Sequence, residues 1–447
     1  MFESLLVANR GEIARRVLRT ASAMGLRTVA IHSEADAALP FVREADEAVL
    51  IGPPPPTESY LDVAKVLEAA KRSGAEAIHP GYGFLAESAD FAEAVIGAGL
   101  GWVGPAPDSI RSMGDKVSAR NLMSDAGVPV APGTREPIDE VASAVAAAAE
   151  IGYPLMVKAS AGGGGIGMGV ARDEAGLRAA FETARTRAER FFGSPAILLE
   201  RYIEGARHVE VQILGLPDGR VVTLGERDCS VQRRHQKVAE ETPSPGVTDA
   251  LRAEMLTGAV RAGEAVGYQG AGTVECLVDP ATQTYVFLEM NTRLQVEHPI
   301  TELVTGVDIV EEQLRIAAGE GPRADLDAIT RDGHAIELRV YAEDPVRFLP
   351  SPGAITRWEE PSGQHIRVDS GYAAGTTVTP FYDPLLAKLC VWGADRDEAL
   401  ARAREAVTTF HVEGPKTNLP FFDRLLADDA FMSGDYNTGL VDGMRKP

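Results

Sequence analysis

The chain has 447 residues, of which 45% are hydrophobic and 24% are charged, a composition typical of a globular protein built from roughly two to four units. The formal net charge of −21 disfavours nucleic acid as a partner, and three widely separated cysteines argue against a disulfide framework or a zinc site. Neither a run of about 18 apolar residues nor an export signal is visible, so we expect a cytoplasmic protein with no membrane partner.

The first 115 residues alternate short apolar runs with helical patterns. The runs that suit strands are 5–8, 28–32, 76–79 and 102–104, and the helical patterns are 12–24, 60–73 and 89–98. This alternation predicts βαβ units and a doubly wound parallel sheet. The first strand-to-helix turn, residues 8–12, contains one glycine, which argues against dinucleotide binding because that function uses a spaced glycine triplet.

From about residue 128 the pattern predicts a smaller unit that closes as a lid. Its elements are a strand at 155–158, a glycine loop, a helix at 174–190 and a strand at 196–200. Strands at 208–215 and 221–227 follow, and after a helix comes a hairpin of 271–278 with 285–290. Strands at 335–342, 364–368 and 386–392 and a helix at 397–410 suggest a third domain. The predicted class is a multidomain fold of α/β and α+β type.

The glycine loop begins at Lys158, contains glycines at 162–165 and 167, and ends at Met168. Consecutive glycines allow backbone N–H groups to surround phosphate oxygens, so the phosphates of ATP are the expected ligand. The loop is not a Walker A motif, because its lysine precedes the glycines. A flexible surface linker is the alternative interpretation, although linkers seldom follow a buried strand directly.

An acidic hairpin carries the clearest candidate metal site. Symmetric pairing about Thr282 places Glu275 opposite Glu289, and two facing carboxylates repel each other unless a cation neutralises them. Hard oxygen ligands beside ATP indicate magnesium. The period-two alternation continues beyond the hairpin and predicts one polar face; a solvated strand face is the alternative. The polar residues of that face are Glu289, Asn291, Arg293, Gln295 and Glu297.

A basic segment at residues 227–237 includes three arginines, His235 and Lys237 in an otherwise acidic protein. It predicts either an oxyanion site or a salt-bridged surface turn, and the segment alone does not decide between them. His79 and His334 are interpreted as structural histidines. Arg339 shares the polar face of its predicted strand with Glu337 and Tyr341, and a salt bridge to Glu337 or Glu343 is its structural interpretation.

Four motifs together resemble the biotin carboxylase family of ATP-grasp enzymes. They are Ala-Asn-Arg-Gly-Glu-Ile-Ala at 8–14, His-Pro-Gly-Tyr-Gly-Phe-Leu at 79–85, the glycine loop, and Glu-Met-Asn-Thr-Arg-Leu-Gln-Val-Glu-His at 289–298. The similarity extends to Tyr-Asp-Pro-Leu-Leu-Ala-Lys-Leu at 382–389. It implies a Rossmann-like N-terminal domain (1–115), an ATP-grasp domain (116–330, lid about 130–204) and a C-terminal biotin carboxylase domain (331–447).

The resemblance also implies site residues. The expected ATP contacts are Lys116, Lys158, Gly163, Gly164, Gly165, Met168, Glu200, Arg201, Ile203, His208, Gln232, His235, Glu275 and Glu289. Magnesium, or manganese, would be held by Glu275, Glu289 and Asn291. Bicarbonate and biotin would contact Tyr82, Lys237, Arg293, Gln295, Val296 and Arg339. Glu297 would be the general base, and the residues expected to act with it in catalysis are Lys237, Arg293 and Arg339.

The implied reaction is ATP-dependent carboxylation of biotin by bicarbonate through carboxyphosphate, the first half-reaction of an acetyl-CoA or other acyl-CoA carboxylase. The chain has no Ala-Met-Lys-Met biotin-acceptor sequence, so biotin is expected in trans on a biotin carboxyl carrier protein. A carboxyltransferase and a second copy of the chain, forming a homodimer, are the other expected partners. The alternatives are another ATP-grasp ligase or a catalytically silent nucleotide-binding subunit.

Three positions depart from the family pattern. Many relatives have basic residues in the glycine loop where this chain has Ile166 and Gly169, which predicts weaker contacts between the lid and phosphate. Arg201 also stands where a lysine is common.

Overall fold

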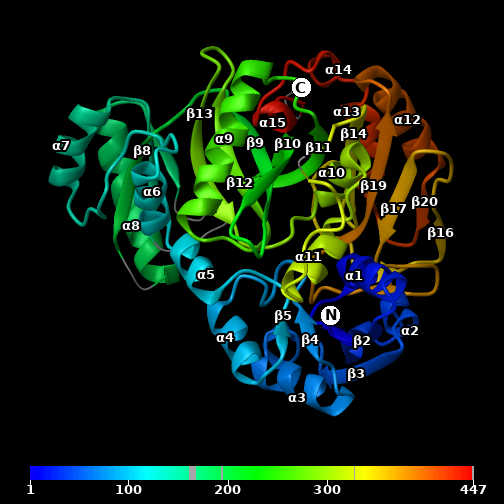
Figure 1. The fold of residues 1–447 in the computed structure, drawn as a ribbon. Helices are drawn as coiled ribbons and strands as arrows, with labels where there is room; N and C mark the ends of the chain where they lie inside the picture. The colour runs from blue at the N-terminus through cyan, green and yellow to red at the C-terminus, as the bar shows by residue number, and fades with distance from the viewer. Residues whose placement is uncertain (161–167, 193–194, 327, 445–447) are drawn as a thin grey trace.

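The structure, a computed structural model, describes residues 1–160, 168–192, 195–326 and 328–444. Figure 1 shows an N-terminal α/β domain in blue and cyan, a small lid in teal that projects to one side, and a central sheet, in green, that continues into the C-terminal part in orange. None of the helices within the described ranges is both long and apolar enough to cross a membrane.

The N-terminal domain contains a parallel sheet in the order β3-β2-β1-β4-β5, which confirms the predicted parallel architecture. Its strands are β1 (Ser4–Val7), β2 (Arg27–Ser33), β3 (Glu47–Gly52), β4 (Ala77–His79) and β5 (Gly101–Trp102). Its helices are α1 (Gly11–Ala23), α2 (Pro40–Glu44), α3 (Val63–Ser73), α4 (Ala89–Gly97) and α5 (Pro107–Gly114), with 3-10 turns η1 (Glu34–Asp36) and η2 (Pro56–Glu58).

Helices α2 and α5 of this domain were not predicted, and two further features differ from the prediction. The sequence analysis missed β3, an edge strand in which only Val49 and Ile51 are buried, so its apolar signal is weak. The helix predicted at 60–73 begins later, at Val63, because Asp62 caps it by accepting the backbone N–H of Lys65 at 3.1 Å.

The lid is a three-stranded antiparallel sheet with two helices packed on it. Its strands, in the order β7-β6-β8, are β6 (Leu155–Ala159), β7 (Gly169–Ala171) and β8 (Ile197–Arg201). The helices are α7 (Val141–Ile151) and α8 (Glu174–Phe192), and α6 (Lys116–Asp125) precedes them. Leu155, Val157 and Phe181 belong to a buried cluster within this unit, which gives the lid a core of its own.

The central sheet has eight antiparallel strands in the order β13-β12-β9-β10-β11-β14-β19-β17. They are β9 (Arg207–Gly215), β10 (Val221–Arg233), β11 (Gln236–Thr242), β12 (Gly270–Asp279), β13 (Thr284–Asn291), β14 (His334–Tyr341), β17 (Ile366–Ser370) and β19 (Leu385–Gly393). Since β11 pairs with β14, one sheet runs through both the ATP-grasp part and the C-terminal part of the chain.

The remaining elements cover this sheet or connect its strands. The helices are α9 (Asp249–Ala265), α10 (His298–Thr305), α11 (Ile309–Ala317), α12 (Arg396–Thr409), α13 (Leu419–Leu425), α14 (Asp429–Ser433) and α15 (Leu440–Met444). The short strands are β15 (Gly353–Ala354), β16 (Arg357–Glu359), β18 (Thr377–Val378) and β20 (His411–Glu413).

The C-terminal half of the sheet has one apolar face and one charged face. Leu338, Leu389 and their neighbours pack against Leu400 of α12 in a buried cluster. On the other face Arg339 lies opposite Lys388, which in turn lies opposite Asp369 on β17. Because the strands are antiparallel and in register, these charges form a row across three strands, on the side of the sheet that carries the candidate site.

Candidate active site

A cavity of about 1210 Å³ lies between the N-terminal domain, the lid and the central sheet. Among the described residues, every predicted site residue lines it except Glu297, which is fully buried beside it. Those residues are Tyr82, Lys116, Lys158, Met168, Glu200, Arg201, Ile203, His208, Gln232, His235, Lys237, Glu275, Glu289, Asn291, Arg293, Gln295, Val296 and Arg339. Gly163, Gly164, Gly165 and Ile166 lie outside the described residues.

The acidic hairpin places Glu275 opposite Glu289, as the sequence predicted. The symmetry assumed for the turn was wrong, however. From Asp279↔Thr284 to Cys276↔Phe287 the partners are one residue out of the predicted register, and a bulge between Glu275 and Cys276 corrects the offset. A β-bulge adds one residue to one strand, and here it brings the two carboxylates into register.

Glu289 lines the cavity, and no cation of the described residues forms an ion pair with it, although Lys116 lies near enough to lower its pKa. Within the described ranges it forms no hydrogen bond or ion pair, and desolvation by the cavity walls and the charge of Glu275 raise its pKa. Glu275 is buried, which raises its pKa, but Lys237 and His208 outweigh this effect and hold the pKa below its ordinary value. A divalent cation between the two carboxylates would compensate Glu289, so the donor set fits a hard metal ion.

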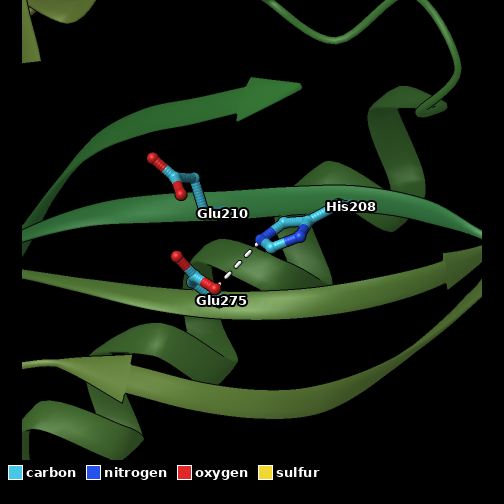
Figure 2. Close-up of side chains that lie close together, drawn as sticks. All are labelled: His208, Glu210 and Glu275. Atoms are coloured by element: carbon cyan, nitrogen blue, oxygen red, sulfur yellow. Dashed lines mark ion pairs between the residues drawn. The ribbon is translucent and has the colours of Figure 1, made fainter. Parts of the chain in front are cut away.

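A second group of possible ligands lies next to this pair. Figure 2 shows His208 and Glu210 on β9 beside Glu275 on β12, and their ligand atoms lie within 4.8 Å of one another. His208 Nε2 is 3.1 Å from a Glu275 oxygen, and Lys237 Nζ lies 2.5 Å from Glu210 and 2.9 Å from Glu275. Lys237 and Arg227 therefore already lie beside Glu210, and Lys237 and His208 beside Glu275, which favours the Glu289 side of Glu275 for a metal.

The predicted single strand through Glu297 is wrong, because β13 ends at Asn291 and residues 292–297 form a turn that leads into α10. Leu294 in this turn is buried in the core shared with the N-terminal domain, which draws the chain out of the sheet. The polar side chains nevertheless converge. Arg293 donates to Asn291 Oδ1 at 3.0 Å and to Gln295 Oε1 at 2.9 Å.

Glu297 lies between two cations. One carboxylate oxygen is 2.7 Å from Lys237 Nζ, and the other is 2.9 Å from Arg339 Nη2. Burial raises the pKa of Glu297, but Lys237 and Arg339 overcome that effect and hold it well below the ordinary range. The carboxylate is therefore ionised and oriented at neutral pH.

Arg339 does not form the salt bridge that its structural interpretation predicted. Its guanidinium contacts Glu240 at 2.5 Å and Glu297 at 2.9 Å, whereas Glu343 pairs with Arg233 at 2.6 Å. Neither partner of Arg339 is close in the sequence, so local periodicity could not reveal them. Burial raises the pKa of Glu240 to about 7, although Arg339 acts in the opposite direction.

The basic segment forms the end of a hairpin whose two turn residues, Arg234 and His235, are exposed. β10 extends to Arg233, and Arg234 and His235, both with positive φ, make the two-residue connection to β11. Arg227 is fully buried and pairs with Glu210 at 2.5 Å. Left-handed backbone is unfavourable for residues with side chains, and both of these turn residues line the cavity.

At the lid end, the cavity is lined by an ion pair and by apolar side chains. Lys158 Nζ pairs with Glu200 at 2.6 Å, and burial lowers the pKa of Lys116. The sequence analysis missed the apolar lining residues, since their periodicity is that of ordinary core positions; they are Met156, Tyr202, Leu277 and Leu288.

The sequence analysis also missed Glu87, whose Oε2 lies 3.0 Å from Arg293 Nε. It lies two residues after a predicted motif at 79–85, but no spacing connects it to Arg293. His79 and His334 have structural partners: His79 accepts the Gly81 N–H, and His334 lies 2.6 Å from Glu241.

Comparison with known proteins identifies the family. Three family models match consecutive parts of the chain: "Biotin carboxylase, N-terminal domain" over residues 1–110, "Carbamoyl-phosphate synthase L chain, ATP binding domain" over 115–324, and "Biotin carboxylase C-terminal domain" over 337–443. A biotin carboxylase of Halalkalibacterium halodurans is 52% identical over 441 residues, which cover 99% of this chain and 97% of that protein. The chain belongs to the biotin carboxylase family. The resemblance drawn from the motifs is thereby confirmed, and the chain is an ATP-dependent carboxylase.

Other relatives and solved structures agree with this assignment. Biotin carboxylase 2 of Bacillus subtilis is 51% identical over 99% of both chains, and a pyruvate carboxylase subunit of Methanothermobacter thermautotrophicus is 47% identical over 100% of this chain and 91% of that protein. A biotin carboxylase complex from Campylobacter jejuni has a TM-score of 0.96 at 40% identity, with 99% of each chain covered. The biotin carboxylase domain dimer of Hydrogenobacter thermophilus 2-oxoglutarate carboxylase, with MgADP and bicarbonate, has a TM-score of 0.94 at 44% identity, covering 99% of this chain and 98% of that one.

Proposed function

We propose that this carboxylase binds ATP between the lid and the central sheet, phosphorylates bicarbonate beside Glu297, and carboxylates a biotin that enters past Arg339. The observation that carries the proposal is the buried Glu297 carboxylate between Lys237 and Arg339 at the edge of the cavity. A carboxylate fixed in this way can take a proton from a small anion that the neighbouring cations hold.

Glu297 acts as the general base. It removes the proton of bicarbonate while an oxygen of that ion attacks the γ-phosphorus of ATP, and ADP leaves. Lys237 and Arg293 offset the negative charge that gathers in the transition state. Because both cations are also held by neighbouring side chains, their positions are set before the substrate arrives.

The acidic hairpin holds the metal in this proposal. Glu275, Glu289 and Asn291 present oxygen atoms to one side of the cavity, which suits Mg²⁺ and also Mn²⁺. When bound, the ion supplies charge neutralisation at the phosphate oxygens. His208, Gln232, His235, Lys116 and Lys158 line the same cavity and serve as the predicted ATP contacts.

The second step takes place at Arg339 and Tyr82. Carboxyphosphate breaks down to CO₂ and phosphate, the phosphate takes the ureido proton of biotin, and the resulting enolate attacks CO₂ to give carboxybiotin. Arg339 stabilises the enolate charge. Closure of the lid excludes water, which would otherwise hydrolyse carboxyphosphate.

The proposed partners follow from the same reaction. Biotin arrives in trans on a biotin carboxyl carrier protein, since the sequence contains no biotin-acceptor tetrapeptide. A carboxyltransferase takes the carboxyl group onward, either to an acyl-CoA, as the motif resemblance implies, or to pyruvate, as the name of the Methanothermobacter relative suggests. We place the reaction in the cytoplasm and expect a homodimer, as for the Hydrogenobacter thermophilus domain.

Release of ADP, measured with bicarbonate and biotin each omitted in turn, tests the proposed function. We expect ADP release to require bicarbonate, and free biotin to be carboxylated slowly and carrier-bound biotin far faster, because the carrier raises the effective concentration. ADP release that is unchanged without bicarbonate would contradict the proposed reaction. Detection of covalent biotin on the purified chain with streptavidin would contradict its delivery in trans.

A further inference from the structure

A buried ion pair behind the cavity joins the N-terminal domain to the central sheet. Lys388 on β19 is fully buried, and its Nζ lies 3.0 Å from Glu12 Oε2 at the start of α1. Glu12 lines the cavity whereas Lys388 does not, and none of the motif-based expectations assigned either residue a role.

Each end of this pair holds a group of the bicarbonate and biotin site. Lys388 Nζ donates to the backbone carbonyl of Val296 at 3.0 Å. The other carboxylate oxygen of Glu12 accepts the hydroxyl of Tyr82. Val296 and Tyr82 line the cavity together with Arg339, so the pair connects two sides of one site.

The contact with Val296 also bears on the general base. The carbonyl of Val296 belongs to the same planar peptide group as the N–H of Glu297, so holding that oxygen fixes the backbone from which the Glu297 side chain extends. Glu297 is the N-cap residue of α10, where the chain turns sharply out of the sheet and has no ladder of strand hydrogen bonds to hold it.

Stability alone does not explain such a pair. Burying two charges is costly, and well-packed apolar side chains of similar volume are often as stabilising. Glu12 and Lys388 also lie near further charges, including Asp369 opposite Lys388 on β17, so the charged arrangement is extensive. A charged pair provides something that apolar packing cannot, namely directional contacts to a hydroxyl and to a carbonyl at opposite ends.

We infer that Glu12 and Lys388 are positioning residues for the carboxylation reaction, holding the Tyr82 hydroxyl and the Val296–Glu297 peptide in place. This inference rests on the proposed function of the cavity. It assigns a catalytic purpose to an ion pair of which only Glu12 reaches the wall of the cavity.

Glu12→Gln is the direct test. A glutamine side chain has a single acceptor oxygen, so it cannot accept from Tyr82 and face Lys388 at the same time. We expect the KM for biotin or for bicarbonate to rise about tenfold or more, the scale of one lost hydrogen bond to a charged group, while the ATP dissociation constant changes less than about twofold. Glu241→Gln is the matched control, because Glu241 is equally buried in the central sheet, pairs with Arg396 and His334, and does not line the cavity.

Two further variants separate positioning from folding. Lys388→Arg keeps the buried charge but changes the donor geometry, so it should lower bicarbonate-dependent turnover with ATP affinity retained. In the Glu12→Gln background, Tyr82→Phe should add little to the change in the KM for biotin, since both changes remove the same contact.

Two results would overturn the inference. The first is an unchanged KM for biotin and bicarbonate in both Glu12→Gln and Lys388→Arg. The second is an equal loss of all activities and of ATP affinity in Glu12→Gln and Glu241→Gln. Either result would leave the proposed function intact, because wild-type ADP release with and without bicarbonate tests that separately.

Discussion

Glu297→Gln tests the core of the mechanism. The substitution removes one charge from a cluster in which each cation keeps another carboxylate: Lys237 stays 2.5 Å from Glu210, and Arg339 stays 2.5 Å from Glu240. We therefore expect the variant to fold. Loss of a positioned base should lower bicarbonate-dependent turnover about 100-fold or more, which corresponds to about 2.7 kcal/mol of transition-state stabilisation.

The assay is ADP release at saturating ATP with varied bicarbonate, together with an ATP binding titration. The ATP dissociation constant should stay within about twofold of wild type, because Glu297 contacts Lys237 and Arg339 and none of the proposed ATP contacts. Glu240→Gln is the matched control: it also removes a buried carboxylate from Arg339 and should cost less than about tenfold. Near wild-type turnover in Glu297→Gln, or an equal loss in Glu240→Gln, would refute the assignment of Glu297 as the base.

Glu289→Gln should raise the magnesium concentration needed for activity and stabilise the metal-free protein, because it removes a carboxylate that faces Glu275. If the magnesium titration of the variant is the same as that of the wild type, the hairpin is not the metal site. Arg339→Ser should abolish carboxybiotin formation but retain some bicarbonate-dependent ADP release, with the acid limb of its pH profile at higher pH, because Arg339 lowers the pKa of Glu297. Equal loss of both activities would place Arg339 in ATP or bicarbonate binding. Burial lowers the pKa of His79 from 6.5 to about 4, so the stability it contributes should be complete above pH 6.5 and decline as the pH falls toward 4. The free energy of unfolding measured in urea should fall by about 3 kcal/mol over this pH range, and by less in His79→Asn. An equal fall in His79→Asn would contradict this explanation.

The sequence predicted those features that depend on local patterns. Alternating apolar runs and helical patterns gave the parallel N-terminal sheet, because period-two and period-3.6 burial are visible within a few residues. The position of Glu275 opposite Glu289 was also predicted, although a β-bulge rather than a symmetric turn produces it. The family motifs supplied residues such as Lys116 and Arg339, which periodicity alone could not have assigned.

The tertiary structure decided which groups surround Glu297. Lys237 and Arg339 reach it from β11 and β14, and the turn after Asn291 carries it out of β13. The predicted continuous strand was wrong because burial of Leu294 against the N-terminal domain outweighs the local alternation.

The link between Lys388 and Glu12 was equally invisible in the sequence, because the two residues belong to opposite ends of the chain. An ion pair leaves no periodic signal, since only the folded sheet and the packed helix bring its members together. The sequence by itself therefore determined the elements and the types of chemical group, whereas the distances that set charge and position at the site arose only when three parts of the chain packed around one cavity.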